Sequence, residues 1–130
     1  MKKTSPSMDA WLQEAKSHPS APKIGMYLTH NGIVRQTPKA KVRFGAEDAR
    51  EVTGMCFDYD PDKVDAVIAD AYKMDGIYYI KVWLNQGALQ VGDDIMYVLV
   101  GGDIRPHVVD GLQFLVEQLK TQCVTETELH

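Results

Sequence analysis

Positively charged side chains stand at the ends of several expected elements, where they could bind an anion. Arg35 ends a predicted strand, Arg105 lies just before the last predicted helix, and Lys120 lies near the C-terminus of that helix. The free N–H groups at a helix N-terminus favour an anion, so Arg105 and its helix favour the same ligand charge. Alternatively, each cation simply makes a surface ion pair or is solvated, which says little about function.

A polar segment between two predicted strands carries further cations. Residues 36–50 include Lys39, Lys41 and Arg43 together with a proline and a glycine. Such a segment is too polar for a core element and predicts a mobile surface loop. Lys39 or Lys41 could add positive charge beside Arg35, although loop lysines are more often only solvated.

Neither the cysteines nor the histidines form a pattern typical of a metal site or a redox pair. Cys56 and Cys123 are far apart, and the four histidines lack the spacing that places two ligands on one metal. We therefore expect free thiols, no metal and no cofactor. Cys123 lies one turn beyond Lys120, which could lower the pKa of its thiol, but an inert structural thiol is the simpler interpretation.

The composition is that of one ordinary globular domain. The 130 residues are 45% hydrophobic and 25% charged, as expected for a chain with a single core. A formal net charge of −4 argues against broad attraction to nucleic acid or to anionic membranes. No apolar run approaches the ~20 residues of a membrane span. We expect a cytoplasmic protein with neither nucleic acid nor membrane among its partners.

The N-terminal part is expected to be a short amphipathic helix over residues 8–16, capped by Ser7 and followed by a linker that contains two prolines. This divides the chain into an N-terminal helix and linker, residues 1–22, and a single α+β domain, residues 23–130. The helix is expected to pack on that domain.

The domain itself should contain two pairs of strands, each pair followed by a helix, and these elements position the cations. Strands are predicted at 24–35, 52–59, 77–84 and 95–100, and helices at 61–75 and 106–121. Asp60 can cap the first of these helices, Pro61 suits its first turn, and Gly76 can end it. The turn at 85–94 makes the last two strands an antiparallel hairpin. Helices on one side of a mainly antiparallel sheet indicate an α+β sandwich.

Several of these segments, taken together, resemble the large, catalytic subunit of molybdopterin synthase. The similar stretch runs from about residue 25 to residue 121. It contains Gly-x-Val-Arg at 32–35, Gly-x-Leu-x-x-Gly-Asp at 87–93, an arginine at 105 and a Leu-Lys-Thr-like element at 119–121. Each motif alone is weak, so the resemblance rests on their order and spacing. It implies the α+β fold of that family, of the α/β hammerhead type.

The resemblance also implies a function in molybdenum cofactor biosynthesis. The family transfers sulfur from the thiocarboxylated Gly-Gly terminus of a ubiquitin-like small subunit to cyclic pyranopterin monophosphate, and its heterotetramer is built on a homodimer. Lys120 would then be catalytic, Arg35 and Arg105 would bind the anionic substrate, and Lys39 and Lys41 could assist. Fifteen residues separate Arg105 from Lys120, ~22 Å along a helix, so Arg105 is expected to act on the neighbouring chain's site.

Several positions depart from the family pattern. A His-Arg pair is replaced by Leu84-Asn85, a histidine by Ile104, and the segment of the second catalytic lysine by Glu126-Thr127-Glu128. The C-terminal tail that usually completes the pocket is also expected to be missing. A carboxylate repels a phosphate, and a missing lysine removes both attraction and possible proton transfer. The alternative is a non-catalytic binding or regulatory homologue that keeps the fold and the dimer.

Overall fold

The structure is a computed structural model that describes residues 1–39, 43, 45 and 50–130. Its elements, in chain order, are α1 (Met8–Lys16), the 3₁₀ turn η1 (Ala21–Lys23), β1 (Met26–Ile33), β2 (Gly54–Tyr59), α3 (Pro61–Tyr72), β3 (Ile77–Leu84), β4 (Gly87–Gln90), β5 (Asp94–Gly102), α4 (Arg105–Gln118), the π-helical turn η2 (Leu119–Cys123) and β6 (Val124–Leu129). Among the described residues, no helix combines the length and apolar character needed to cross a membrane.

The strands of the described ranges form two antiparallel sheets, with strand orders β1-β5-β3 and β4-β2-β6. In the first sheet, β5 is central: Val100 lies opposite Leu28 of β1, and Val98 lies opposite Val82 of β3. The predicted α+β class with a mainly antiparallel sheet is confirmed, and so is the antiparallel pairing of β3 with β5.

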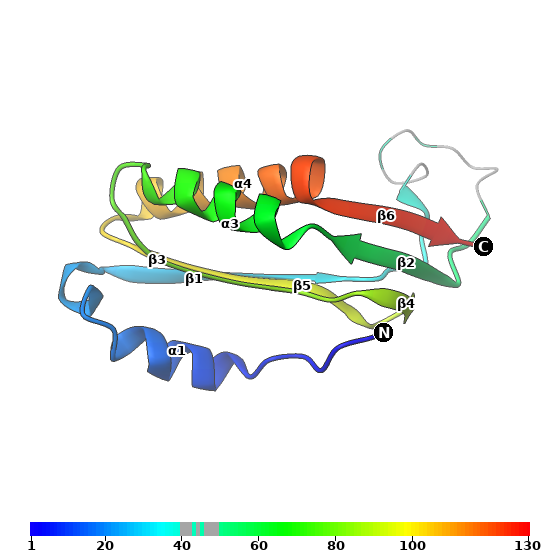
Figure 1. Cartoon of the computed structure of the whole chain (residues 1–130), viewed down its shortest axis with the longest axis horizontal. Coiled ribbons are helices and arrows are strands. Elements are labelled where there is room, and N and C mark those ends of the chain that lie inside the picture. Colours follow the sequence, from blue (N-terminus) through cyan, green and yellow to red (C-terminus); the bar gives the residue numbers. More distant parts are fainter. Residues whose placement is uncertain (40–42, 44, 46–49) are drawn as a thin grey trace.

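Helices cover both faces of the first sheet (Figure 1). On one face, α3 and α4 cover a core that includes Val98, Val100 and Leu115, and β2 and β6 prolong this layer beyond the helices. On the other face, Trp11 of α1 packs with Leu99 of β5. The prediction of helices on one side is wrong for α1, because central strand β5 is apolar on both faces and each face needs a cover.

The ends of the helices follow from local chemistry. The Ser7 hydroxyl accepts a hydrogen bond from Ala10 N–H at 3.3 Å at the start of α1. The Asp60 carboxylate accepts one from Asp62 N–H at 3.0 Å at the start of α3, as the sequence predicts. Gly76 has a φ of +75° in the turn after α3, where a side chain would meet Asp103.

Two strands were not expected from the sequence. The predicted turn 85–94 contains β4, which pairs with β2, and the polar segment Glu126-Thr127-Glu128 belongs to β6, which pairs with the other edge of β2. The predicted helix 106–121 is instead α4 followed by the π-helical turn. Neither missed strand shows a clear apolar alternation, because only Leu89 of β4 is fully buried and β6 is mostly polar.

Candidate functional site

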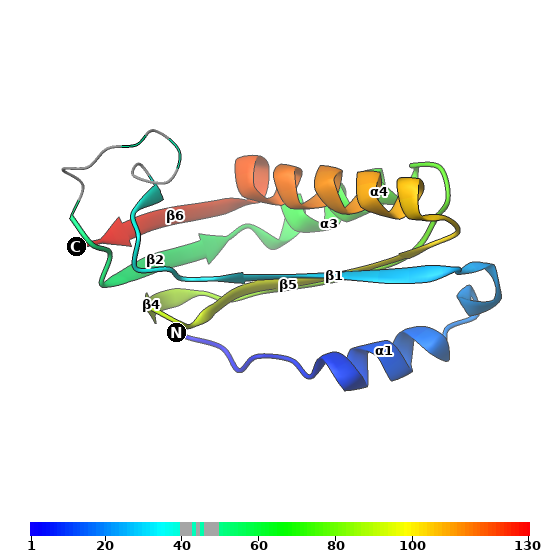
Figure 2. The ribbon, with the colours of Figure 1, turned by 180° about the vertical axis from the view of Figure 1, so that it is seen from behind.

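A groove lies beside β1, the C-terminal half of α4, the π-helical turn and β6. It consists of two adjoining cavities of about 600 and 490 Å³. Five residues line both cavities: His30, Lys39, Arg43, Lys120 and Glu126. In the view of Figure 2, β1 runs below α4, and the chain passes from α4 through the π-helical turn into β6. These elements therefore bring together residues from distant parts of the sequence.

Three of the predicted site residues line this groove. Arg35, two residues after β1, lines the smaller cavity, and Lys39 and Lys120 line both. Lys120 lies in the π-helical turn rather than in α4 itself, so its exposed side chain projects where the chain leaves the helix for β6. Lys41 lies outside the described residues. The groove thus presents a cluster of cations that can hold phosphate or carboxylate groups.

Arg105 lies at the other end of α4, where it is the first helical residue. It lines neither cavity of the groove as the described residues outline them. The rest of α4 and the start of the π-helical turn separate Arg105 from Lys120, about 22 Å of helix. Ile104, at the N-cap, is 53% exposed and makes no capping hydrogen bond with its side chain. One small ligand cannot contact both cations in a single chain.

Carboxylates face the same groove. Glu126 and Glu128 of β6 lie opposite Phe57 and Met55 of β2 and share their inward face. The Glu128 carboxylate accepts a hydrogen bond from the backbone N–H of Lys39 at 3.0 Å. Of the described residues, the cations that line the two cavities are Arg35, Lys39, Arg43 and Lys120, and the carboxylates are Glu117, Glu126 and Glu128. The acidic side chains offset much of the positive charge that a bound anion would meet.

His30 and Arg43 are groove residues that the sequence interpretation did not select. His30 is half-buried on β1. It lies on the same face of the strand as Met26 and Leu28, which pack against the main core. Burial, and then the positive charge of Lys120, hold the pKa of His30 below its usual value. The alternation along β1 is the signal that places His30 on the same face as Met26 and Leu28, although the spacing of the histidines indicates no metal site.

The thiols do not belong to this groove. Cys56 is free and exposed on β2, and Cys123 is free and buried. Burial, and then the charge of Asp60, raise the pKa of the Cys123 thiol. Lys63 acts in the opposite direction, but its effect is the smallest of the three. A raised pKa keeps the thiol protonated at neutral pH and favours an inert structural role.

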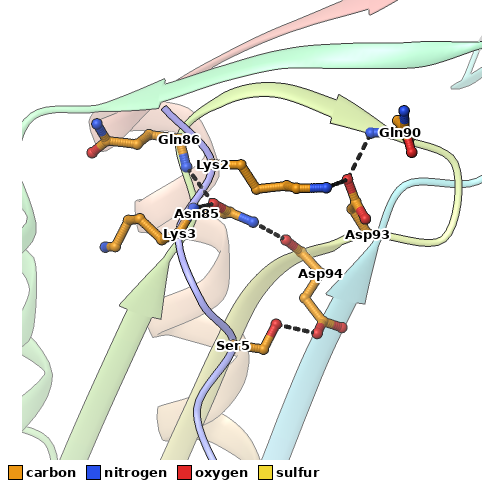
Figure 3. A network of polar contacts seen from close by, with 8 residues as sticks. All are labelled: Lys2, Lys3, Ser5, Asn85, Gln86, Gln90, Asp93 and Asp94. Atoms are coloured by element: carbon orange, nitrogen blue, oxygen red, sulfur yellow. Dashed lines mark hydrogen bonds and ion pairs between the residues drawn. The ribbon is translucent and has the colours of Figure 1, made fainter.

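The position of the expected His-Arg pair is occupied by a structural polar network (Figure 3). Asn85 is 2% exposed, and its side-chain oxygen accepts hydrogen bonds from the backbone N–H groups of Lys3 and Gln86 at 2.7 and 2.9 Å. Its amide nitrogen donates to the carbonyl of Asp94 at 2.8 Å. The Lys3 ammonium donates to the carbonyl of Leu84 at 2.6 Å. Asn85 therefore fixes the N-terminal segment.

Comparison with known proteins identifies the family of this chain. The sequence model of the family described as "MoaE protein" matches residues 2–122. No curated protein sequence matches the chain significantly.

Solved structures of other proteins share the fold. The molybdopterin biosynthesis MoaE protein from Burkholderia ambifaria is 18% identical, with a TM-score of 0.72 over 98% of this chain and 84% of its own. Molybdopterin synthase from Staphylococcus aureus is 14% identical, with a TM-score of 0.71 over 96% and 86%. A complex of subunits 1 and 2 of molybdopterin-converting factor from Helicobacter pylori is 16% identical, with a TM-score of 0.67 over 96% and 80%.

Proposed function

Since this chain belongs to the MoaE protein family, the large subunits of molybdopterin synthase in molybdenum cofactor biosynthesis, we propose that its groove is the site of sulfur transfer. The observation that carries the proposal is the gathering of Arg35, Lys39 and Lys120 in one groove. These residues come from separate elements, and the family resemblance assigns substrate binding or catalysis to Arg35 and Lys120. The substrate is cyclic pyranopterin monophosphate.

In this proposal, the cations divide the work. Arg35 and Lys39 hold anionic groups, because guanidinium and ammonium groups bind phosphate and carboxylate by charge-assisted hydrogen bonds. The Lys120 ammonium stands where the two cavities meet and assists the reaction at the sulfur-accepting carbon. Lys41 remains a further candidate for substrate binding, although it lies outside the described residues. These roles of Arg35, Lys39 and Lys120 do not require a metal or a cofactor.

The sulfur donor in this proposal is a ubiquitin-like small subunit with a thiocarboxylated C-terminal Gly-Gly tail. The Helicobacter pylori structure, a complex of two subunits of the molybdopterin-converting factor, supports a small-subunit partner. A flexible tail needs only an open groove, and Lys120 with Arg43 offers positive charge for its terminal group.

Arg105 takes part only if two chains assemble. The length of α4 separates Arg105 from the groove of its own chain, so we place it on the groove of a second copy across a two-fold axis. A homodimer would then carry two composite sites, each with Lys120 from one chain and Arg105 from the other.

A non-catalytic binding homologue is the second candidate function. The observation that favours it is the inward orientation of Glu126 and Glu128, which occupy the segment where the family's second lysine is expected. Such a protein would keep the groove and the partner but would lack the second amine for proton transfer.

Reconstitution decides between the two candidates. Purified protein, thiocarboxylated small subunit and cyclic pyranopterin monophosphate are combined, and the dithiolene product is measured as its fluorescent oxidised derivative. We expect product, with a loss of at least about 100-fold in Lys120→Ala, because the amine acts at the reacting centre. Lys73→Ala is the matched control, since the Lys73 side chain makes an exposed ion pair with Asp70 and lines neither cavity of the groove as the described residues outline them. Absence of product together with intact small-subunit binding would select the non-catalytic homologue.

A further inference from the structure

His30 stands on β1 where the two cavities of the groove meet. It lines both of them beside Lys120 and Glu126. Met26 and Leu28, on the same face of the strand, pack in the main core, so His30 extends this inner face to the point where it opens into the groove. A half-buried side chain on a paired strand is held in place more firmly than the lysines around it.

The His30 ring makes no hydrogen bond to the described part of the protein, whereas the other three histidine rings do. His18 bonds to the Ser20 hydroxyl at 2.7 Å, His107 to the Asp103 carboxylate at 2.7 Å, and His130 to the Arg50 carbonyl at 3.1 Å. No fully buried side-chain nitrogen or oxygen among the described residues lacks a partner. The ring nitrogens of His30 are therefore not sealed in the core and can reach a ligand in the cavity.

The charges around His30 make its protonation sensitive to an anion. The groups that face the groove are Lys39 and Arg43 from the segment after β1, Arg35 at the end of β1, Glu117 of α4, Lys120 of the π-helical turn, and Glu126 and Glu128 of β6. Burial and the charge of Lys120 hold the pKa of His30 below its usual value, which disfavours the charged ring. An entering oxyanion would offset the field of Lys120 and offer the protonated ring an acceptor.

We propose that His30 is a direct ligand of the phosphate group of the substrate and takes up a proton when that group enters the groove. This inference rests on the proposed function only in placing the substrate in this groove. It adds to the lysines a residue that changes its charge near neutral pH, which a lysine does not do. The groove would then gain positive charge on binding, in partial compensation for Glu126 and Glu128.

The test follows all four histidine rings by NMR between pH 4.5 and 8.5, in sodium sulfate and in sodium chloride of equal ionic strength. Sulfate serves as the phosphate-like probe because its charge stays constant over this range. We expect saturating sulfate to raise the titration midpoint of His30 by about one unit, which corresponds to about tenfold tighter binding to the protonated ring. The midpoints of His18, which lies against Tyr79 on the α1 side of the sheet, and of His107, in the first turn of α4, should barely move, because salt screens charges over such separations.

A substitution separates direct contact from a general charge effect. His30→Gln keeps a polar side chain without the titration and should weaken sulfate binding about tenfold at pH 5 while changing it little at pH 8. His107→Gln, which alters a ring at the opposite end of α4, should leave sulfate binding unchanged. An unmoved His30 midpoint at saturating sulfate, or no sulfate binding at all, would overturn the assignment. No sulfur donor is used, so a protein that fails reconstitution can still pass this test.

Discussion

Glu126 weakens the attraction of the groove for anions, and its removal should be measurable. The carboxylate lines both cavities beside Lys120, so it repels any phosphate that Lys120 attracts. Glu126→Gln should tighten sulfate binding about two- to fivefold at low ionic strength, and the gain should shrink as salt is added. Asp65→Asn, on the exposed side of α3, changes the net charge equally and should have no such effect. Equal gains in both variants would mean that net charge, not local placement, governs binding.

Some groove residues could be predicted from the sequence, whereas others could not. Arg35 and Lys120 could be selected because they fall in short patterns shared with a known family, and the groove contains both. Alternation along β1 gives the strand face of His30, but its proximity to Lys120, which is distant in sequence, follows only from the packing of α4 and the π-helical turn against β1. Sequence patterns identify residues within one segment, whereas a site between segments depends on packing.

At the scale of elements, β6 holds the wall of the groove in place by pairing with β2. The Asp60 N–H donates to the Cys123 carbonyl at 2.9 Å, and the same register puts Thr127 opposite Cys56 in a hydrogen-bonded pair. Thr127→Pro should remove that bond and lower the free energy of unfolding by about 1–3 kcal/mol, measured by urea denaturation.

The adjacent position supplies the control for this strand. The N–H of Glu126 points away from β2 in this register, and proline is tolerated on an edge strand where the N–H faces outward. Glu126→Pro should therefore cost clearly less stability than Thr127→Pro. Equal losses would show that β6 contributes no specific pairing and that the register is wrong.

The helices were predictable from their own residues, whereas the second sheet was not. In α3, Asp60 caps the helix, Pro61 opens it, and its buried residues recur at helical spacing, so local chemistry suffices. In β6, the inward side chains are Val124, Glu126 and Glu128. Two of these three are charged, so the sequence of β6 does not alternate between apolar and polar residues. This strand exists because β2 offers it an edge, a long-range contact that leaves no periodic signal.

At the scale of the whole molecule, the N-terminal segment joins the two sheets. The Lys3 ammonium donates to Tyr59 of β2 at 2.9 Å and to the carbonyl of Leu84 in β3 at 2.6 Å, and it lies over the ring of Trp83, 5.5 Å from the ring centroid. Figure 3 shows Lys3 beside Asn85, which lies where β3 passes into β4 and the chain leaves one sheet for the other. These contacts hold β2 of one sheet and β3 of the other in a fixed relation at this point.

The separation of Arg105 and Lys120 along α4 leads to a prediction about the assembly. If Arg105 completes the site of a second copy, Arg105→Ala and Lys120→Ala should each inactivate a homodimer. A dimer of one Arg105→Ala chain and one Lys120→Ala chain regains one intact site, because its two unaltered residues face each other across the two-fold axis. An equal mixture of the exchanged variants should therefore recover about a quarter of the native sulfur transfer in the reconstitution assay.

Chain exchange must be verified by native mass spectrometry before the assay is read. Wild-type protein mixed with Arg105→Ala under the same conditions supplies the reference for exchange alone. If the verified heterodimer stays as inactive as its parents, Arg105 acts within its own chain or not at all, and the composite site is excluded. Recovery, in contrast, requires that Lys120 and Arg105 meet only between chains, because about 22 Å of helix separates them within one.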